Sequence, residues 1–349
     1  MPTISTVSAA LMVCSAVSLA QPPPAITEYS IPTSSSRPSG ITLGPDGALW
    51  FTEDNGNKVG RITTAGVVTE YPIPTASSGP GAIALGADGA LWFIEQNGNK
   101  IGRITTAGVF TEYPLPTVFS NPDGIAAGPD GALWFTELIT NKIGRITTAG
   151  TITEYPSVSF NDPSFITAGP DGALWFTAFI GGIGRITTGG AVIQYAVPNG
   201  ATNGITTGPD GALWFTETNG SNIGRITTAG TITEYSIPTS SCIPFGIATG
   251  PDGALWFTEF AGNKIGRVTT GGVFAEYLLP TAISNPSAIT LGPDGALWFT
   301  EQNANKIGRV GLPGPSGTPA PASIWLTLIG LTCAGFYAAR RGRVHRVGS

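Results

Sequence analysis

Most charged side chains in this 349-residue chain recur at the same place in seven similar segments, so few residues give any one segment a chemistry of its own. When the recurring charges are set aside, four remain among the repeated segments: Arg37, Asp54, Asp123 and Asp162. Carboxylate, guanidinium and amide groups could bind a polar small molecule through hydrogen bonds. The candidate binding residues, which stand beside the start of an expected strand, are Arg37, Asp123, Asp162, Asn203 and Asn285.

The same five positions also suit an ordinary solvated loop rim, since Asn and Asp are common turn formers. Both interpretations, a polar ligand site and a loop rim, stay open at this point. A catalytic base that works near neutral pH is usually a histidine, and the only histidine in the sequence is His345, close to the C-terminus. We therefore expect no catalytic residue, no metal ligand and no cofactor.

The recurring charges are better explained as structural. A glutamate and a lysine flank the same expected hairpin loop, so we expect the two to pair across it. The glutamates are Glu53, Glu95, Glu137, Glu217, Glu259 and Glu301, and the lysines are Lys58, Lys100, Lys142, Lys264 and Lys306. The fourth segment has Ala178 in place of the glutamate and lacks the lysine as well, which is consistent with pairing. An arginine also recurs in every segment, at Arg61, Arg103, Arg145, Arg185, Arg225, Arg267 and Arg309.

The segments that must position these residues are about 42 residues long, and a marker tryptophan falls at 50, 92, 134, 175, 214, 256 and 298. In the first segment, Pro45-Asp46-Gly47 and Thr64-Ala65-Gly66 are typical of turns. They separate expected strands at 40–44, 48–53, 58–63 and 67–73. Strands that are apolar on both faces must be covered on both sides, as the stacked blades of a propeller are. We therefore expect the tryptophans in the blade core.

A second marker, the tyrosine of Thr-Glu-Tyr or a variant of it, starts one step earlier than the tryptophan. One copy, Thr27-Glu28-Tyr29, precedes the first tryptophan, and none follows the last. A spare strand at 26–31 can therefore complete the last segment, whose own strands end near Val310. The predicted fold class is all-β: a seven-bladed β-propeller of four-stranded antiparallel blades, closed by the N-terminal strand. An open solenoid is the alternative, but it would need polar caps.

The connections between antiparallel strands alternate between two faces of such a ring. The first-to-second and third-to-fourth turns are nearly uniform in sequence, whereas the second-to-third loops and the blade-to-blade connections vary. A face that contacts a ligand must break the sevenfold symmetry. We therefore place any function on the variable face, around the central channel.

Composition narrows the choice of partner. The formal net charge is −5, although Arg340, Arg341, Arg343 and Arg346 stand in the last ten residues. An acidic body disfavours nucleic acid, because binding to phosphates needs a basic patch. Only Cys242 lies outside the terminal apolar segments, so no internal disulfide is expected. We expect a monomer that binds a small molecule, a glycan or a surface protein.

The domain boundaries predicted are a signal peptide at 1–20, the propeller at 21–310, a Gly/Pro linker at 311–321, and a transmembrane or sorting tail with an arginine-rich end at 322–349. The stretch Pro319-Ala320-Pro321-Ala322-Ser323 precedes the apolar span and the arginine cluster. This tail resembles the PEP-CTERM sorting signals of Gram-negative exporters. The resemblance implies an exported protein, periplasmic, surface-exposed or secreted, that the tail tethers to a membrane unless it is processed.

The repeat itself strongly resembles that of the streptogramin lyase (virginiamycin B lyase) family over roughly residues 25–310. The resemblance implies a seven-bladed propeller that opens the lactone ring of type B streptogramins by elimination, with a bound magnesium ion and a histidine base. The motif of that family at the last blade is Glu-Pro-His-Gly, with another glutamate beyond the second strand. Here these positions are Asn285-Pro286-Ser287-Ala288 and Gln302. We therefore expect the fold to carry over and the reaction not to.

Three functional hypotheses follow. The leading one is an exported, envelope-anchored propeller that acts as a ligand-binding, protein-binding or scaffold module. The second is a magnesium-dependent lyase of the streptogramin type with an altered site. The third is a purely structural surface protein, in which Arg37, Asp123 and Asp162 bind nothing.

Overall fold

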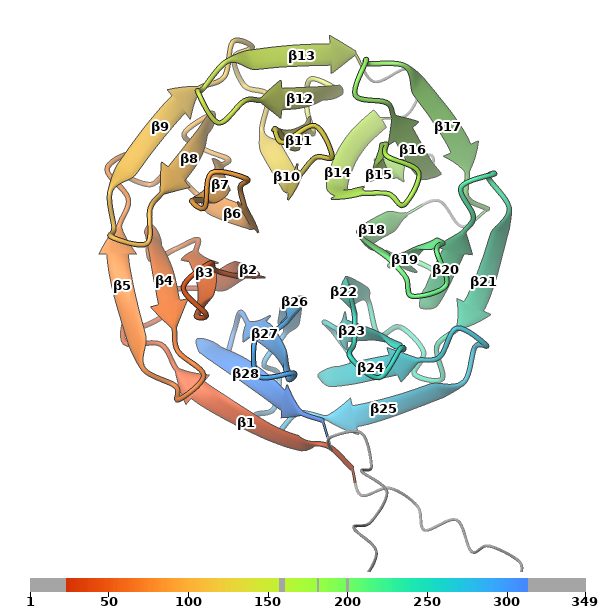
Figure 1. The fold of residues 1–349 in the computed structure, drawn as a ribbon. Coiled ribbons are helices and arrows are strands. Elements are labelled where there is room, and N and C mark those ends of the chain that lie inside the picture. The colour runs from red at the N-terminus through yellow and green to blue at the C-terminus, as the bar shows by residue number, and fades with distance from the viewer. Residues whose placement is uncertain (1–22, 157–160, 181, 199–200, 313–349) are drawn as a thin grey trace, which may run out of the picture. The chain divides into compact units, whose positions relative to one another are not determined.

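The computed structural model describes residues 23–156, 161–180, 182–198 and 201–312. In this part of the chain, 28 strands form seven four-stranded antiparallel sheets, arranged as blades around a central opening (Figure 1). The predicted seven-bladed, all-β propeller is therefore confirmed. No described residue belongs to a helix that is long and apolar enough to cross a bilayer. The predicted signal peptide and nearly all of the predicted linker and tail lie outside the described residues.

Each blade starts at the channel and ends at the rim of the ring, and we number the blades 1 to 7 from β2 onward. The innermost strands are β2 (Pro38–Leu43), β6 (Pro80–Leu85), β10 (Pro122–Ala127), β14 (Asn161–Ala168), β18 (Thr202–Thr207), β22 (Pro244–Thr249) and β26 (Pro286–Leu291). The second strands are β3 (Leu49–Glu53), β7 (Leu91–Glu95), β11 (Leu133–Glu137), β15 (Leu174–Ile180), β19 (Leu213–Glu217), β23 (Leu255–Glu259) and β27 (Leu297–Glu301). The third strands are β4 (Lys58–Ile62), β8 (Lys100–Ile104), β12 (Lys142–Ile146), β16 (Gly182–Ile186), β20 (Asn222–Ile226), β24 (Lys264–Val268) and β28 (Lys306–Gly311). The rim strands are β5 (Val68–Pro72), β9 (Phe110–Pro114), β13 (Ile152–Pro156), β17 (Val192–Ala196), β21 (Ile232–Ser236), β25 (Phe274–Leu278) and β1 (Ala25–Ser30).

The core lies between blades, because each second strand is buried on both of its faces. In β3, all five residues are buried, and Trp50 and Phe51 are 0% exposed. Trp50 of blade 1 belongs to the same apolar cluster as Leu91 and Phe93 of blade 2. The tryptophans therefore form the blade core, as predicted, and no blade can bury its apolar residues without a neighbour on each side.

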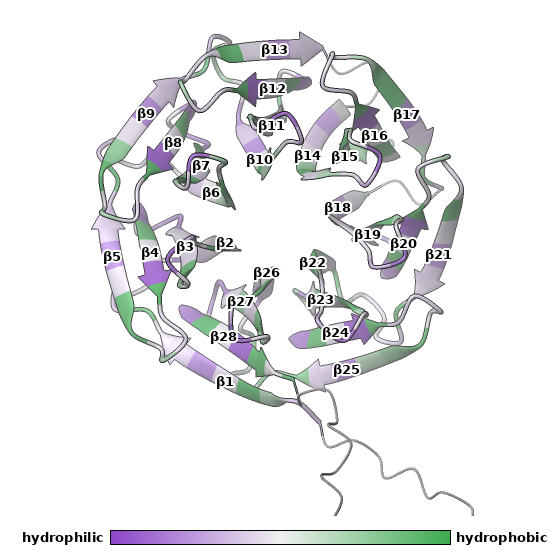
Figure 2. Cartoon of the chain, viewed as in Figure 1, coloured by the Kyte–Doolittle hydropathy of each residue, from purple (hydrophilic) through white to green (hydrophobic). Residues whose placement is uncertain are grey.

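The uniform turns are built around one repeated contact. Asp46 accepts a hydrogen bond from Trp50 Nε1 at 3.0 Å and from Arg61 Nε at 2.6 Å. The same Asp–Arg pair occurs in all seven blades. Figure 2 shows the resulting hydrophilic ends of the third strands, β4, β8 and their equivalents. The recurring arginines are thus part of the blade architecture.

The expected pairing of Glu53 with Lys58 across the hairpin loop is wrong, although the two residues do face each other in the strand register. Lys58 Nζ instead bonds to Glu70 Oε2 of β5 at 2.9 Å and to Thr33 Oγ1 at 2.5 Å. Glu53 is 0% exposed, whereas the Lys58 side chain keeps 26% of its surface in water. A Glu53–Lys58 pair would place both charges in the buried part of the blade, and their desolvation would offset the attraction.

We call each set such as Thr33, Glu70 and Lys58 a Thr–Glu–Lys seam, since it ties a blade-to-blade connection to the rim strand and third strand of the following blade. The described residues contain five seams, in blades 1, 2, 3, 6 and 7. Blades 4 and 5 have Gly182 and Asn222 in place of the lysine, and Gln194 replaces the glutamate in blade 4.

The ring is closed by β1, as the sequence predicts. β1 pairs antiparallel with β28, from Ala25 opposite Gly311 to Ser30 opposite Lys306. Lys306 Nζ lies 2.7 Å from Glu28 Oε2, so the seam of blade 7 joins the two ends of the propeller. Asn305 Oδ1 also accepts a hydrogen bond from the backbone N of Ser36, at 2.7 Å, and so joins blade 7 to blade 1.

Deleting residues 25–33 should lower the melting temperature by more than about 10 °C, because the deletion exposes Trp298 and leaves β28 without a partner. A loss of 1 kcal/mol corresponds to about 2–4 °C for a domain of roughly this size. Circular dichroism melts of the deletion and of Glu28→Gln, a control that keeps the strand, would measure this. An unchanged melting temperature in the deletion would show that β1 does not close the ring.

The buried glutamates at the ends of the second strands have raised pKa values. Burial, reinforced by the nearby Glu70 carboxylate, raises the pKa of Glu53 from 4.5 to about 7. Burial likewise raises the pKa to about 7 or 8 in four further blades, at Glu95, Glu137, Glu259 and Glu301. The folded chain therefore holds protons between pH 4.5 and 7 that the unfolded chain has released, and stability falls as the pH rises through this window.

The propeller should accordingly melt at a higher temperature at pH 5 than at pH 8. Replacing Glu53 with Gln should leave stability at pH 5 nearly unchanged and raise it at pH 8, by at most about 3 kcal/mol, since one pKa unit corresponds to about 1.4 kcal/mol. Ala178 at the same place in blade 4 shows that a neutral residue fits. Calorimetric melts at both pH values would test this, and an equal gain at pH 5 and pH 8 would contradict it.

Candidate functional site

All seven innermost strands enter the channel through the same irregular backbone. In β2, Pro38 lies opposite Glu53 and Ile41 opposite Phe51, so one extra residue forms a β-bulge. The six other innermost strands show the same shift. A bulge redirects side chains relative to a regular strand. At this bulge, the residue that follows the proline lines the channel in five blades, at Ser39, Gly81, Asp123, Phe245 and Ser287.

The residue before the proline adopts a left-handed backbone conformation. Its φ is 54° at Arg37, 63° at Asp162, 49° at Ile243 and 52° at Asn285. This conformation is uncommon outside glycine and is strained for a β-branched residue such as Ile243. The chain therefore turns sharply as it reaches the channel in six of the seven blades; blade 5 has Thr202 in place of the proline.

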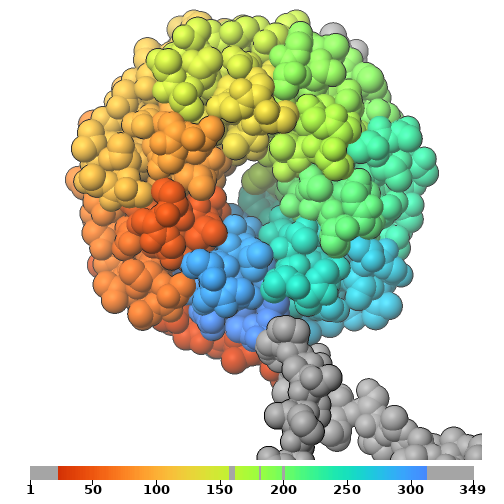
Figure 3. Space-filling view, in the orientation of Figure 1, coloured from red at the N-terminus to blue at the C-terminus, as the bar shows by residue number. Residues whose placement is uncertain are grey.

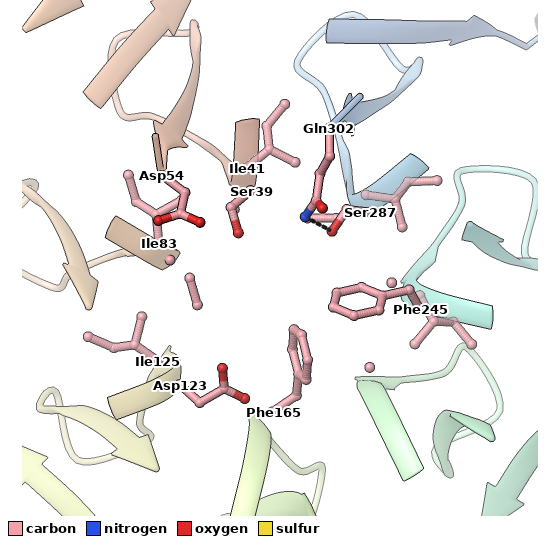
Figure 4. A pocket seen from close by; sticks show the side chains of 18 of the residues that line it. Ser39, Ile41, Asp54, Ile83, Asp123, Ile125, Phe165, Phe245, Ser287 and Gln302 are labelled. Carbon is pink, nitrogen blue, oxygen red and sulfur yellow. Dashed lines mark hydrogen bonds between the residues drawn. The ribbon is translucent and has the colours of Figure 1, made fainter. Parts of the chain in front are cut away.

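The channel holds a cavity of about 310 Å³ that residues from all seven blades line. Figure 3 shows the opening at the centre of the ring, and Figure 4 shows the side chains that converge on the cavity. Isoleucines from six blades form its apolar belt: Ile41, Ile83, Ile125, Ile205, Ile247 and Ile289. They are almost fully buried, so the belt is rigid and the side chains at the bulges determine the character of the cavity.

The wall formed by blades 7, 1, 2 and 3 is polar. Arg37 Nη1 lies 3.2 Å from Asp54 Oδ2, and Gln302 Nε2 donates to Ser287 Oγ at 3.1 Å. Burial raises the pKa of the Asp54 carboxyl, and the Arg37 charge opposes that rise.

Asp123 also lies in this wall, and no cationic partner for it is found among the described residues. Its Oδ1 accepts from Gln96 Nε2 at 3.1 Å, and its Oδ2 accepts from Ser164 Oγ at 2.5 Å. Burial raises the pKa of the Asp123 carboxyl, and these two hydrogen bonds only partly oppose it. Both partners are neutral, so an ionised Asp123 brings an unbalanced negative charge to the cavity.

The wall formed by blades 4 and 6 is aromatic. The rings of Phe165 and Phe245 meet edge to face with centroids 5.5 Å apart, and Phe260 lies 6.1 Å beyond Phe245. Figure 4 shows both rings of the first pair directed into the cavity, with the Asp123 carboxylate beside Phe165. Aromatic surface and polar groups thus face each other across one small space, which is the usual composition of a small-molecule pocket.

Phe165 fits because blade 4 departs from the pattern of its neighbours. Glycine or alanine occupies this position in the other six blades. In blade 3 a side chain there would meet the next blade, since a Cβ at Gly124 would lie 2.4 Å from Ser164 O. In blade 3, Thr136 Oγ1 donates to that same carbonyl of blade 4, and equivalent bonds join four other pairs of blades. Thr177 of blade 4 instead contacts its own Phe165.

Two of the five predicted binding residues, Arg37 and Asp123, lie together in the cavity wall. The other three lie outside it. Asn285 Nδ2 donates to Phe260 O at 3.1 Å. Asp162 lies near the start of β14 with a φ of 63°. Asn203 is 6% exposed, with no hydrogen-bond partner for Oδ1 among the described residues.

Phe165, Gln96 and Gln302 line the cavity but are not among the predicted binding residues, although Gln302 stands at a position of the family motif. A signal for Phe165 was present, because a large aromatic residue replaces a glycine or alanine that six repeats share. Gln96 and Gln302 both follow the glutamate that ends a second strand, where Asp54 also stands. From that position, Gln302 bonds to the bulge residue Ser287 of its own blade, and Gln96 bonds to the bulge residue Asp123 of the next blade. Sequence spacing alone does not reveal these contacts.

The residues at the last blade do not fit the magnesium ion that the family resemblance implies. Ser287 and Gln302 bond to each other, and Asn285 bonds to a backbone carbonyl and to Asn303. These donors are neutral, whereas magnesium is usually held by carboxylates. No three His, Cys, Asp or Glu side chains gather into a metal-binding group in the described part of the chain.

Comparison with known proteins gives consistent results. The family described as the virginiamycin B lyase family matches residues 17–161 and 158–318. A selenomethionine-substituted virginiamycin B lyase from Staphylococcus aureus has 42% sequence identity and a TM-score of 0.79, and the match covers 83% of this chain and 99% of that one. A catalytically inactive histidine-to-alanine variant of the S. aureus enzyme, solved with quinupristin, gives 41% identity and the same TM-score over 83% of this chain and 99% of that one.

Two further similarities are more limited. The virginiamycin B lyase of Bacillus licheniformis is 49% identical over 41 residues, which are 12% of this chain and 14% of that protein. The extracellular domain of a putative hybrid two-component system from B. thetaiotaomicron shares the fold, with 17% identity, a TM-score of 0.67, and coverage of 84% of this chain and 42% of that one. The family match and the S. aureus structures extend over most of the propeller, and they show that the chain belongs to the virginiamycin B lyase family.

Proposed function

We propose that this propeller is a binding module that holds a small molecule in its central channel. The observation that carries this proposal is the asymmetric cavity, with an aromatic wall at Phe165 and Phe245 opposite a hydrogen-bonding wall. Its volume of about 310 Å³ falls at the lower end of the range of about 300–1,000 Å³ that is typical of ligand pockets. The ligand should therefore be small and should combine an apolar group with polar ones.

The family suggests lactone opening as the second candidate function, because the related S. aureus protein is a virginiamycin B lyase. The residues of the last blade argue against it here. Ser287 stands where the family motif has its histidine, and its hydroxyl accepts a hydrogen bond from the neutral Gln302. Neither group is a general base near neutral pH, and neither supplies the negative charge that holds magnesium.

The binding module acts outside the cytoplasm and is tethered to the cell envelope. This part of the proposal rests on the sequence of the two ends, namely the apolar stretch before residue 20 and the apolar span followed by Arg340 and Arg341. The net charge of −5 supports a partner other than nucleic acid.

The neutral aromatic alcohol 2-phenylethanol should bind in the cavity and give saturation-transfer NMR signals with residues 21–312. Replacing Phe245 with Ala should weaken binding by about tenfold, since loss of one aromatic contact costs about 1–1.5 kcal/mol. Phe119→Ala is the matched control, because Phe119 is 83% exposed and does not line the cavity. Equal binding by the parent and Phe245→Ala would contradict the proposal.

The two candidate functions differ in one assay. The binding-module proposal predicts that incubation of the same protein with quinupristin and magnesium yields no linearised product by mass spectrometry, whereas the lyase candidate predicts that product. Turnover that Ser287→Ala abolishes would establish the enzyme and would overturn the binding-module proposal.

A further inference from the structure

We propose that the ligand of this channel carries an ammonium group next to an apolar group, with Asp123 as its counterion and the Phe165 and Phe245 rings against its cationic end. This inference rests on the proposed function and specifies the ligand class for the same cavity. The family motif at the last blade does not include the residues of this part of the cavity, which blades 3, 4 and 6 contribute.

The charged side chains that line the cavity do not balance one another. Its lining contains three charged side chains, Arg37, Asp54 and Asp123. Arg37 and Asp54 neutralise each other at 3.2 Å. Asp123 is left with the neutral partners Gln96 and Ser164. With all three groups ionised, the cavity has a net charge of −1, the sum of one positive and two negative groups. A cation is the ligand that balances it. Burial raises the pKa of Asp123 in the empty cavity, and a bound cation opposes that rise.

The Asp123 carboxylate can accept more hydrogen bonds than its two partners donate. A carboxylate has about four acceptor positions, and Gln96 and Ser164 occupy one on each oxygen. The remaining positions are free to accept from N–H groups of a ligand, and Figure 4 shows the carboxylate directed into the open space. These two hydrogen bonds also hold the carboxylate in place, which reduces the entropy lost on binding.

A pair of aromatic rings, Phe165 and Phe245, lies beside this carboxylate. Ser164, which bonds to Asp123, directly precedes Phe165 in the chain, so the carboxylate and the Phe165 ring are neighbours. The face of an aromatic ring attracts a cation, and aromatic rings combined with a negative group are a common way to bind ammonium ions. An anionic ligand would instead meet two aromatic rings and an unbalanced carboxylate.

The experiment compares three probes of similar size that carry the same phenyl ring: 2-phenylethylammonium, 2-phenylethanol and phenylacetate. Calorimetric titration of residues 21–312 at pH 7.5 should show that the ammonium binds about tenfold more tightly than the alcohol, and that phenylacetate binds most weakly. Equal affinity for the ammonium and the alcohol would overturn the ammonium assignment while leaving the binding module intact. Binding of none of the three would count against the binding module itself.

Substitutions at Asp123 test whether this residue causes the preference for the ammonium probe. Asp123→Asn should retain the alcohol and lose the preference for the ammonium. Asp123→Ser serves the same purpose and is certain of a compatible backbone, because Ser39 and Ser287 occupy this bulge position in blades 1 and 7. Asp162→Asn is the matched control, since it removes an acid near the same channel that does not line the cavity. A preference that survives in both Asp123 variants, or that disappears in Asp162→Asn, would refute the role of Asp123.

Discussion

The pairing of β1 with β28 is the constraint on which the rest of the ring depends, because every second strand needs an apolar neighbour on both faces. A row of seven such blades would leave two of these strands half exposed, and only closure covers them all. Closure joins Glu28 to Lys306, 278 positions apart in the chain. It also fixes the width of the channel, and therefore the distance between the aromatic wall at Phe245 and the polar wall at Ser39.

Architecture and binding chemistry are assigned to different parts of each blade. The Asp46–Trp50–Arg61 contact recurs in all blades and supports the turn that carries it. The bulge after the proline also recurs, but its side chain changes from blade to blade. One backbone geometry thus presents seven independently variable residues around a common axis. This arrangement allows a family to keep its fold while the chemistry of its channel changes, as the neutral pair Ser287 and Gln302 illustrates.

The sequence predicts the repeat, the strand boundaries to within about two residues, and the closure, because these follow from local periodicity and from the count of strands. It does not predict the partner of Lys58, since Glu53 and Glu70 are both close to it and only their burial decides between them. The sequence also predicts Asn285 and Asp162 as binding residues, although neither lines the cavity. The two sides of the proline differ in direction, and that difference arises from the left-handed turn and the bulge.

The five Thr–Glu–Lys seams leave blades 4 and 5 as a continuous sector without one, and Thr177 in this sector does not bond to the next blade. Blade 4 is the only blade in the described residues that lacks both kinds of contact, because Thr216 of blade 5 bonds to Phe245 O, and blade 2, with Ile94 in place of the threonine, keeps its seam. Phe165 lies on blade 4, whereas Phe245 and Asp123 lie on blades 6 and 3. Phe165 is therefore held by fewer polar bonds between blades than its neighbours in the cavity wall, so a change in ligand shape should displace this ring at a lower free-energy cost than the others.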